Sequence, residues 1–191
     1  LSIGGMQLFK TESYETPDKV VPKAASFAAG ISIVYITLTV IWALMLWGAG
    51  MPMFDSIAHA MTTLATGGYS TKSESLAAFN SSTIEIIIIF GMLVGSLPFV
   101  HYLTLSKNGL KNLIKDDQVK LFLTMVLFVV LIISLYLSFN NMPYLDALRL
   151  SSFNVVSIIT GTGFGTSNFS NWGGFPTTIL LILMFVGGCA G

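Results

Sequence analysis

Four long stretches of the sequence contain no Asp, Glu, Lys or Arg, and a chain of this pattern is suited to a membrane. A helix needs about 20 apolar residues to cross roughly 30 Å of hydrocarbon. The first three stretches are each long enough for one crossing, whereas the fourth is interrupted by Gly, Asn and Pro. Only 9% of the residues are charged, against about a quarter in globular domains, so we expect an all-α membrane protein. The uncharged stretches run from Ala24 to Phe54, Ile86 to Ser106, Leu121 to Leu145 and Leu150 to Gly191.

Composition also excludes several functions. The formal net charge is zero, so the chain lacks the basic footprint of a nucleic-acid-binding protein. Cys189 is the only cysteine, which excludes an internal disulfide and a cysteine-based metal cluster. Hydrolysis inside a membrane needs a nucleophile–base pair or metal ligands at fixed spacing, and no HExxH, GxGD or GxSxG motif occurs. We therefore expect no enzymatic activity and no covalently bound cofactor.

The distribution of basic residues predicts the topology. Lysines cluster in segments 10–23 and 107–120, and positive residues collect on the cytoplasmic side of a membrane. An even number of crossings must separate two cytoplasmic segments, and we expect crossings at 27–49 and 84–106. The apolar stretch 51–65 between them would form a helix of about 22 Å, too short to cross. It should enter the membrane and return, which occurs only where the turning backbone is packed in protein or lines a watery cavity.

The same order of features occurs twice. Met51-Pro52-Met53-Phe54-Asp55 returns as Met142-Pro143-Tyr144-Leu145-Asp146, and Gly68-Tyr69-Ser70-Thr71 returns as Gly163-Phe164-Gly165-Thr166. Each repeat contains a crossing, a re-entrant helix, a glycine turn and a second crossing, and transporters commonly build a midplane site from repeats.

This organisation predicts four segments. Residues 1–26 form a cytoplasmic segment, 27–106 the first repeat, 107–120 a cytoplasmic loop, and 121–191 a second repeat truncated in its last helix. The sequence begins with Leu1 and ends inside an apolar run, so we expect it to be an internal fragment of a longer protein.

The two glycine motifs indicate a cation pathway. Thr66-Gly67-Gly68-Tyr69 and Gly161-Thr162-Gly163-Phe164-Gly165 each follow a short helix, whose C-terminal end carries partial negative charge. Glycine permits positive φ and close backbone approach. Rings of backbone carbonyls replace the hydration shell of potassium in filters of the Thr-Val-Gly-Tyr-Gly type, and the second motif is a near copy. A glycine turn alone is often only a packing feature, but two in equivalent positions favour a potassium filter.

At these residues the sequence resembles the Trk/Ktr/HKT superfamily of potassium transporters, and most of all its bacterial Trk-type membrane subunits. Residues 65–71 resemble the second filter loop of that family, and residues 160–166 resemble the third. Gly187-Gly188-Cys189-Ala190-Gly191 is similar to the start of the broken stretch that forms an intramembrane gate in the family.

The resemblance implies a fold and a function for these residues. Family members join four such units around one pore, so this chain would hold the second unit and most of the third. The family binds potassium, its transported ligand, through carbonyls that precede each central glycine. Those positions here are Thr66 and Gly67 before Gly68, and Gly161 and Thr162 before Gly163. The gate would include Gly187, Gly188, Ala190 and Gly191.

The resemblance also implies a location and partners. It suggests a multi-pass protein of the inner cell membrane, surrounded by lipid, that assembles as a homodimer with a cytoplasmic nucleotide-binding regulatory subunit. Transport is either channel-like or coupled to sodium or protons as symport. The competing hypotheses are a sodium-coupled solute carrier with broken helices, a non-transport membrane enzyme and a structural membrane subunit.

Several other residues have two interpretations each. Glu85 either closes a capping box with Ser82 or gathers cations, and we favour the cap. We expect Arg149 to have a surface or interface role. His59 and His101 suggest proton coupling or a metal site, but packing or hydrogen bonding is favoured because they lack partners at ligand spacing. Gly91, Gly95 and Pro98 mark either a hinge or close helix packing.

Overall fold

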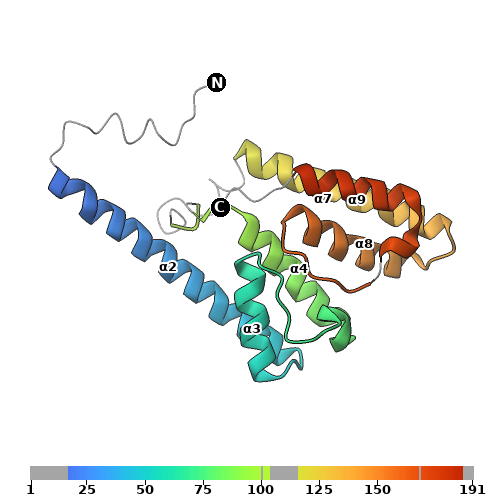
Figure 1. Ribbon diagram of the computed structural model, residues 1–191, viewed down its shortest axis with the longest axis horizontal. Coiled ribbons are helices and arrows are strands. Elements are labelled where there is room, and N and C mark those ends of the chain that lie inside the picture. Colours follow the sequence, from blue (N-terminus) through green and yellow to red (C-terminus); the bar gives the residue numbers. More distant parts are fainter. Residues whose placement is uncertain (1–16, 100, 104–115, 168, 187–191) are drawn as a thin grey trace.

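The computed structural model describes residues 17–99, 101–103, 116–167 and 169–186, and within these ranges the chain forms helices and no strand. Figure 1 shows α2, α3 and α4 on one side of the molecule and α7, α8 and α9 on the other. The all-helical architecture predicted from the sequence is confirmed. The helices are α2 (Pro17–Gly48), α3 (Met53–Leu64), η1 (Ser75–Phe79), α4 (Ser82–Ser96), α7 (Asp117–Phe139), α8 (Tyr144–Ile159), η2 (Phe169–Trp172) and α9 (Gly174–Val186).

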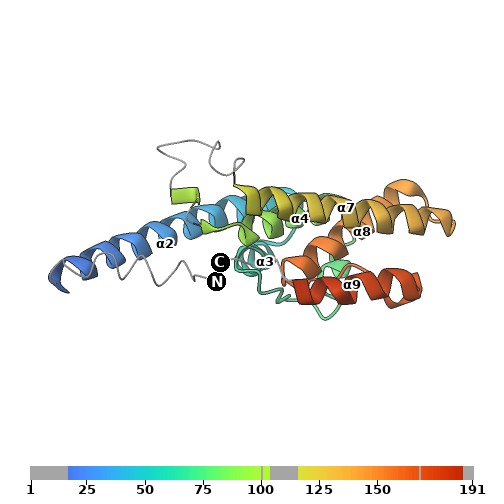
Figure 2. The same cartoon turned by 90° about the horizontal axis from the view of Figure 1, so that it is seen from above.

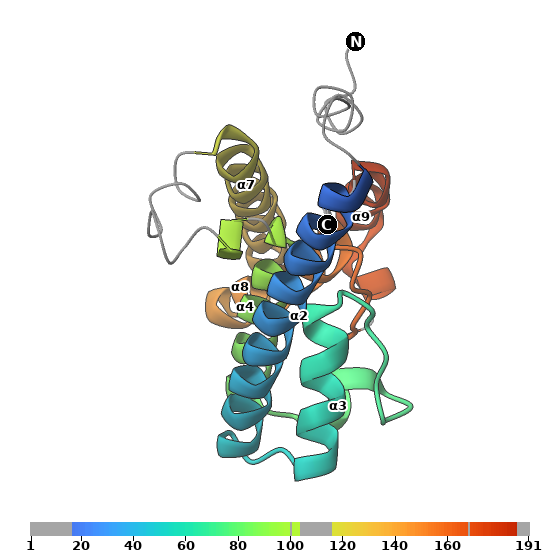
Figure 3. The same cartoon turned by 90° about the vertical axis from the view of Figure 1, so that its left-hand side faces the viewer.

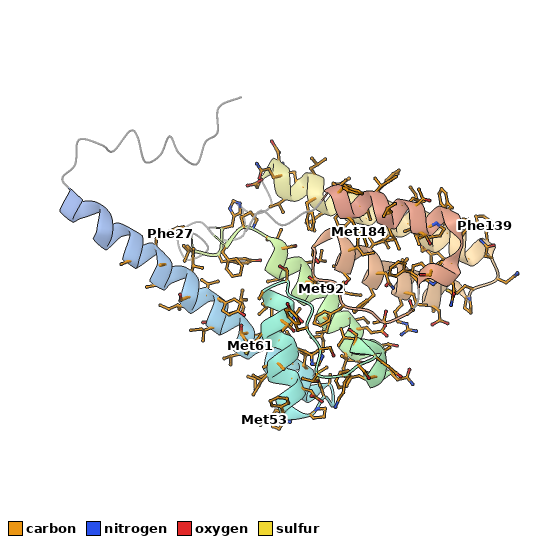
Figure 4. All side chains as sticks on the ribbon, in the orientation of Figure 1. Phe27, Met53, Met61, Met92, Phe139 and Met184 are labelled. Atoms are coloured by element: carbon orange, nitrogen blue, oxygen red, sulfur yellow. The ribbon has the colours of Figure 1, made fainter. Side chains whose placement is uncertain are left out.

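Two of the described helices are long and apolar enough to cross a membrane. They are Ala25–Gly48, with a mean hydropathy of 2.1, and Asp117–Phe139, with a mean hydropathy of 2.7. Many of their large apolar side chains remain exposed. In Figure 4, Phe27 and Phe139 lie at the periphery, whereas Met92 lies at the centre of the molecule. An apolar outer surface of this kind suits contact with lipid rather than water.

The second predicted crossing is not one continuous helix. Helix α4 ends at Ser96, and Leu97 is extended, with φ −81° and ψ 149°. The ring of Pro98 disfavours the helical conformation for the residue before it, which accounts for the break. The chain is helical again at residue 99 and over 101–103. The crossing expected over 84–106 is therefore interrupted at Pro98, one of the residues read from the sequence as either a hinge or a packing feature.

Glycines on α4 allow it to pack closely against α2 and α3. A Cβ atom on Gly95 would lie 2.6 Å from the Leu64 carbonyl oxygen, and one on Gly91 would collide with the Trp42 indole. The Trp42 indole N–H also donates a hydrogen bond of 3.0 Å to the Ile87 carbonyl. Figure 3 shows α2 and α3 side by side. Of the two interpretations of Gly91 and Gly95, close helix packing is supported.

The two short helices α3 and α8 begin in the same way. Pro52 precedes α3 and Pro143 precedes α8, each with φ −54°, a value that the proline ring fixes. An acidic residue, Asp55 or Asp146, follows in the first turn, where it interacts favourably with the helix dipole. Helix α8 has 16 residues and α3 has 12, so α8 is about one turn longer.

Each of the helices α3 and α8 contacts the other two α-helices of its own repeat. In the first repeat, α3 contacts α2 and α4, and in the second, α8 contacts α7 and α9. Figure 2 shows α8 between α7 and α9, which overlap in Figure 1. The repeats meet where α4 contacts α8. One core joins the six α-helices that the described residues form, α2, α3, α4, α7, α8 and α9, and includes Trp42, Ala60, Met92, Ile133, Phe153 and Leu180.

Candidate functional site

The two glycine motifs form loops with the same backbone pattern. We call residues 65–71 the first glycine loop and residues 160–166 the second glycine loop. The first has positive φ at Thr66 (48°) and Gly68 (64°), and the second at Gly161 (71°) and Gly163 (84°). Left-handed residues therefore alternate with others at matching positions. Carbonyls alternate sides along an ordinary strand, whereas alternating handedness allows successive carbonyls to face one side, as a carbonyl filter requires.

Thr66 is held in a conformation that its side chain disfavours. A β-branched residue with positive φ is an outlier, because its Cβ crowds the backbone. The equivalent position in the second loop is Gly161, which has no such cost. Strained residues of this kind persist where the surrounding structure imposes them, and they concentrate at functional sites.

The two glycine loops touch each other. A Cβ atom on Gly68 would collide with the carbonyl oxygen of Thr162 and would lie 3.3 Å from the carbonyl carbon of Gly163. Gly68 must therefore be glycine for two reasons, its positive φ and the adjacent Thr162 backbone. The structure thus brings together residues of both predicted filter motifs, although they are far apart in sequence.

The predicted ligand residues differ in side-chain environment. Gly67, Gly161 and Gly163 are exposed, and Thr66 is half-buried. The Thr162 side chain is buried, with its hydroxyl 2.8 Å from that of Thr160. Since most of these positions offer no side-chain ligand, backbone carbonyls are the groups available to a cation.

A hydroxyl on each short helix binds the loop that follows it. Thr62 Oγ1 donates to the Tyr69 carbonyl at 2.9 Å, and Ser157 Oγ donates to the Phe164 carbonyl at 2.7 Å. Both bonds join residues separated by seven positions, and both end on the aromatic residue after the central glycine. We did not identify Thr62 or Ser157 from the sequence.

Backbone bonds add to these hydroxyl contacts. The Gly68 amide donates to the Thr62 carbonyl at 3.4 Å, and the Gly163 amide donates to the Ser157 carbonyl at 3.1 Å. Each central glycine is therefore tied to the same helix residue that supplies the hydroxyl. The signal that could have revealed this pairing is the repeat itself, which places Thr62 and Ser157 at equivalent positions.

The side chain of His59, on α3, contacts residues of both glycine loops. It is fully buried, with Nδ1 2.7 Å from the Asp55 carbonyl and Nε2 2.9 Å from Ser70 Oγ. Its ring is stacked on Phe164, with 5.9 Å between centroids, and meets Phe79 edge-on. The interpretation of His59 as a packed, hydrogen-bonded residue is therefore supported.

The start of α3 is joined to the chain that leaves the first glycine loop. Thr71 Oγ1 donates to Asp55 Oδ1 at 2.7 Å, and Lys72 Nζ lies 3.3 Å from Asp55 Oδ2. These contacts close the loop at its far end. Asp55 therefore acts at the helix start and also binds the loop.

An ion pair joins the two repeats. Arg149 on α8 binds the buried carboxylate of Glu85 on α4 at 2.8 Å, and it lies 3.5 Å from Asp146. The expected interface role of Arg149 is supported. The predicted capping box was wrong, because Ser81, not Ser82, caps α4 by accepting from the Ile84 amide. The cap lies one residue earlier than expected, and the Glu85 side chain binds Arg149.

His101 lies far from His59 in the chain and has a different partner. Its Nε2 is 2.9 Å from Asp116 Oδ2, and Asp116 caps α7. The pKa of Asp116 is lowered, mainly because the Gln118 amide donates a hydrogen bond to this carboxylate.

No group of three or more His, Cys, Asp or Glu suited to a metal ion occurs among the described residues. The gate residues Gly187, Gly188, Ala190 and Gly191 lie outside these residues.

Comparison with known proteins extends these observations. The family model named TrkH, described as a cation transport protein, matches residues 1–191. The Trk system potassium uptake protein TrkH of Salmonella typhimurium is 38% identical over 196 residues, covering 100% of this chain and 41% of that protein. Trk system potassium uptake protein TrkI of Halomonas elongata is 35% identical, covering 100% of this chain and 39% of that protein.

A solved structure agrees with this similarity. The crystal structure of the potassium transporter TrkH from Vibrio parahaemolyticus superposes with a TM-score of 0.85 at 32% identity, covering 98% of this chain and 38% of that one. The chain spans about two fifths of the length of these relatives. The match confirms both the resemblance and the all-α membrane fold predicted from the sequence. The chain therefore belongs to the TrkH family of cation transport proteins.

Proposed function

We propose that the two glycine loops are neighbouring parts of one potassium filter, through which the full-length protein takes up potassium across the cell membrane. The observation that carries this proposal is the contact between Gly68 and Thr162. It places two loops of matching left-handed pattern against each other, as a shared pore requires. The names of the relatives, which are potassium uptake proteins, support potassium as the ion.

The carbonyls of Thr66, Gly67, Gly161 and Thr162 are the proposed potassium ligands. Peptide oxygens in a filter replace the water around the ion. The C-terminal ends of α3 and α8, which lead directly into the loops, add partial negative charge. Potassium is then a transported ligand, and the proposed activity requires no bound cofactor.

Location and partners follow from the same proposal. The exposed apolar surfaces of α2 and α7 suit a multi-pass protein of the inner membrane, with segments 10–23 and 107–120 in the cytoplasm. The relatives are named as parts of a Trk system, which supports an assembly of several components. We propose a homodimer with a cytoplasmic nucleotide-binding regulatory subunit, and a gate at residues 187–191.

Rubidium uptake by the full-length protein in a potassium-transport-deficient strain tests the proposal. We expect uptake that potassium inhibits more strongly than sodium does. Gly163→Ala should reduce this preference, because Gly163 has positive φ. Gly165→Ala is the matched control, because Gly165 lacks positive φ and a Cβ atom there would meet no described atom within 4 Å.

Two outcomes would contradict the proposal. Absence of both rubidium entry and growth rescue would exclude potassium uptake, and sodium-driven entry of an organic solute would instead indicate a solute carrier. Equal effects of the Gly163 and Gly165 variants would show that the left-handed backbone is not what selects the ion.

A further inference from the structure

We infer that the hydroxyls of Thr62 and Ser157 are positioning residues that hold the carbonyls of Tyr69 and Phe164 against the short helices and away from the ion. Each glycine loop would then offer the ion only the carbonyls of the residues that precede its central glycine. This inference rests on the proposed potassium filter and specifies which oxygens of the loops take part in it.

The geometry of the two hydrogen bonds supports this division. The Tyr69 carbonyl lies 2.9 Å from Thr62 Oγ1, and the Phe164 carbonyl lies 2.7 Å from Ser157 Oγ. Both lone pairs of a carbonyl lie at its oxygen end. A carbonyl that accepts from the helix behind the loop is therefore turned away from the opposite side, where the ion would pass.

Chance does not explain these hydrogen bonds, because the same bond occurs in both repeats. The two hydroxyls occupy equivalent positions, and both bind the carbonyl seven residues later. The residues that make the contact differ, since one repeat uses Thr and Tyr and the other uses Ser and Phe. What the repeats share is a hydroxyl donor on the helix and a backbone acceptor in the loop.

The two hydrogen bonds should differ in strength. Ser157 and Phe164 are both buried, so the hydrogen bond between them is shielded from water. Thr62 Oγ1 also lies 3.1 Å from the Ala58 carbonyl and 3.3 Å from the His59 carbonyl. Because a threonine hydroxyl has one proton to donate, its bond to Tyr69 competes with these contacts.

Neighbouring hydroxyls provide matched controls. Thr63 is buried and donates to the His59 carbonyl of its own helix at 2.6 Å. Ser151 is buried and donates to the Leu148 carbonyl at 3.1 Å. Neither bond reaches a glycine loop, so removing either hydroxyl changes helix packing and polarity without releasing a loop carbonyl.

The test measures rubidium uptake and its inhibition by potassium and by sodium in the full-length protein. We expect Ser157→Ala to reduce the preference for potassium over sodium roughly two- to tenfold, the effect of losing one hydrogen bond. Thr62→Val should reduce it less, and Thr62→Ser, which retains the hydroxyl, should preserve it. Thr63→Val and Ser151→Ala should also leave the preference unchanged at equal protein levels in the membrane.

Different failures have different meanings. If the unmodified protein takes up no rubidium, the proposed function and this inference both fail. If the unmodified protein is selective but Thr62→Val and Ser157→Ala retain full preference, the inference fails while the proposed function stands. Equal loss in the Thr63 and Ser151 controls would also overturn it, by assigning the effect to general packing. Should Ser157→Ala not accumulate in the membrane, the Thr62→Val and Thr62→Ser pair decides the outcome.

Discussion

The two glycine loops reach one backbone conformation with different side chains. The first contains Thr66 and Gly68 at its left-handed positions, and the second contains Gly161 and Gly163. The first loop therefore tolerates a strained threonine where the second has glycine. The repeat has retained φ angles rather than residue types, which is expected if the backbone is the functional group.

The loops also differ in what supports them. The first is held within its own repeat, where His59 binds Ser70 and Asp55 binds Thr71. The second is held by Ser157 of its own repeat and also by the other repeat, because the Leu76 amide donates to the Gly165 carbonyl at 3.2 Å. The Arg149–Glu85 ion pair adds a further link from α8 to the first repeat. Changes to the first repeat should therefore affect both loops.

The largest expected effect is the loss of stability on replacing Gly68, which should exceed the loss on replacing Gly163. Gly68→Ala forces a Cβ atom into the Thr162 carbonyl in addition to disfavouring the left-handed backbone, so we expect destabilisation of about 3 kcal/mol or more. Gly163→Ala, for which a Cβ atom would meet no described atom within 4 Å, should cost only about 1–2 kcal/mol. Thermal unfolding in detergent measures both, and equal losses would show that the loops do not touch.

Breaking the ion pair tests the dependence of the second loop on the first repeat. Arg149→Ala leaves the Glu85 carboxylate buried without its closest cation. We expect a loss of about 2 kcal/mol, below the value for fully buried pairs, because the Arg149 side chain is 30% exposed. Lys120→Ala, which removes the exposed pair with Asp117, is the control and should change stability little.

Restoring the pair with opposite polarity sharpens that test. A Glu85→Arg and Arg149→Glu double variant should recover part of the stability that each single change loses. No recovery relative to the single variants would indicate that Glu85 and Arg149 act independently.

A smaller effect is expected from the residues that support the loops from behind. His59→Leu removes the bond to Ser70 and the contact with the Phe164 ring, and we expect a loss of about 1–2 kcal/mol. Asn154, the equivalent residue in the second repeat, contacts Ser167 more weakly at 3.3 Å, so Asn154→Leu should cost less. A larger loss for Asn154→Leu in unfolding measurements would reverse the comparison.

The smallest expected effect concerns the strained threonine. Thr66→Gly relieves the left-handed strain but increases the freedom of the unfolded chain, and the two contributions of about 1 kcal/mol nearly cancel. The unfolding temperature should therefore remain close to that of the unmodified protein. A loss of several kcal/mol would indicate that the Thr66 side chain, and not its backbone, supports the loop.

The sequence predicted the parts of this structure that depend on local patterns. Apolar stretches located α2 and α7, and the short apolar stretch 51–65 located α3. For Pro98 the sequence left a hinge and close helix packing both open, because apolar composition does not report whether a helix is continuous. The cap of α4 was misplaced by one position because Ser81 and Ser82 are both suited to the role.

The contacts between distant residues could not be predicted in the same way. Arg149 and Glu85 are separated by 64 positions, and no local pattern relates them. The contact of Gly68 with Thr162 likewise depends on how the two repeats pack. The equivalence of Thr62 and Ser157 could have been predicted by aligning the short helices of the two repeats as well as their glycine motifs.

Anomalous diffraction from crystals of the full-length protein grown with rubidium tests most directly whether the glycine loops bind a cation through peptide oxygens. We expect a rubidium peak in contact with the carbonyls of Thr66, Gly67, Gly161 and Thr162, and none beside the carbonyls of Tyr69 and Phe164. Rubidium bound elsewhere, or loops that face lipid with no ion between them, would contradict the account.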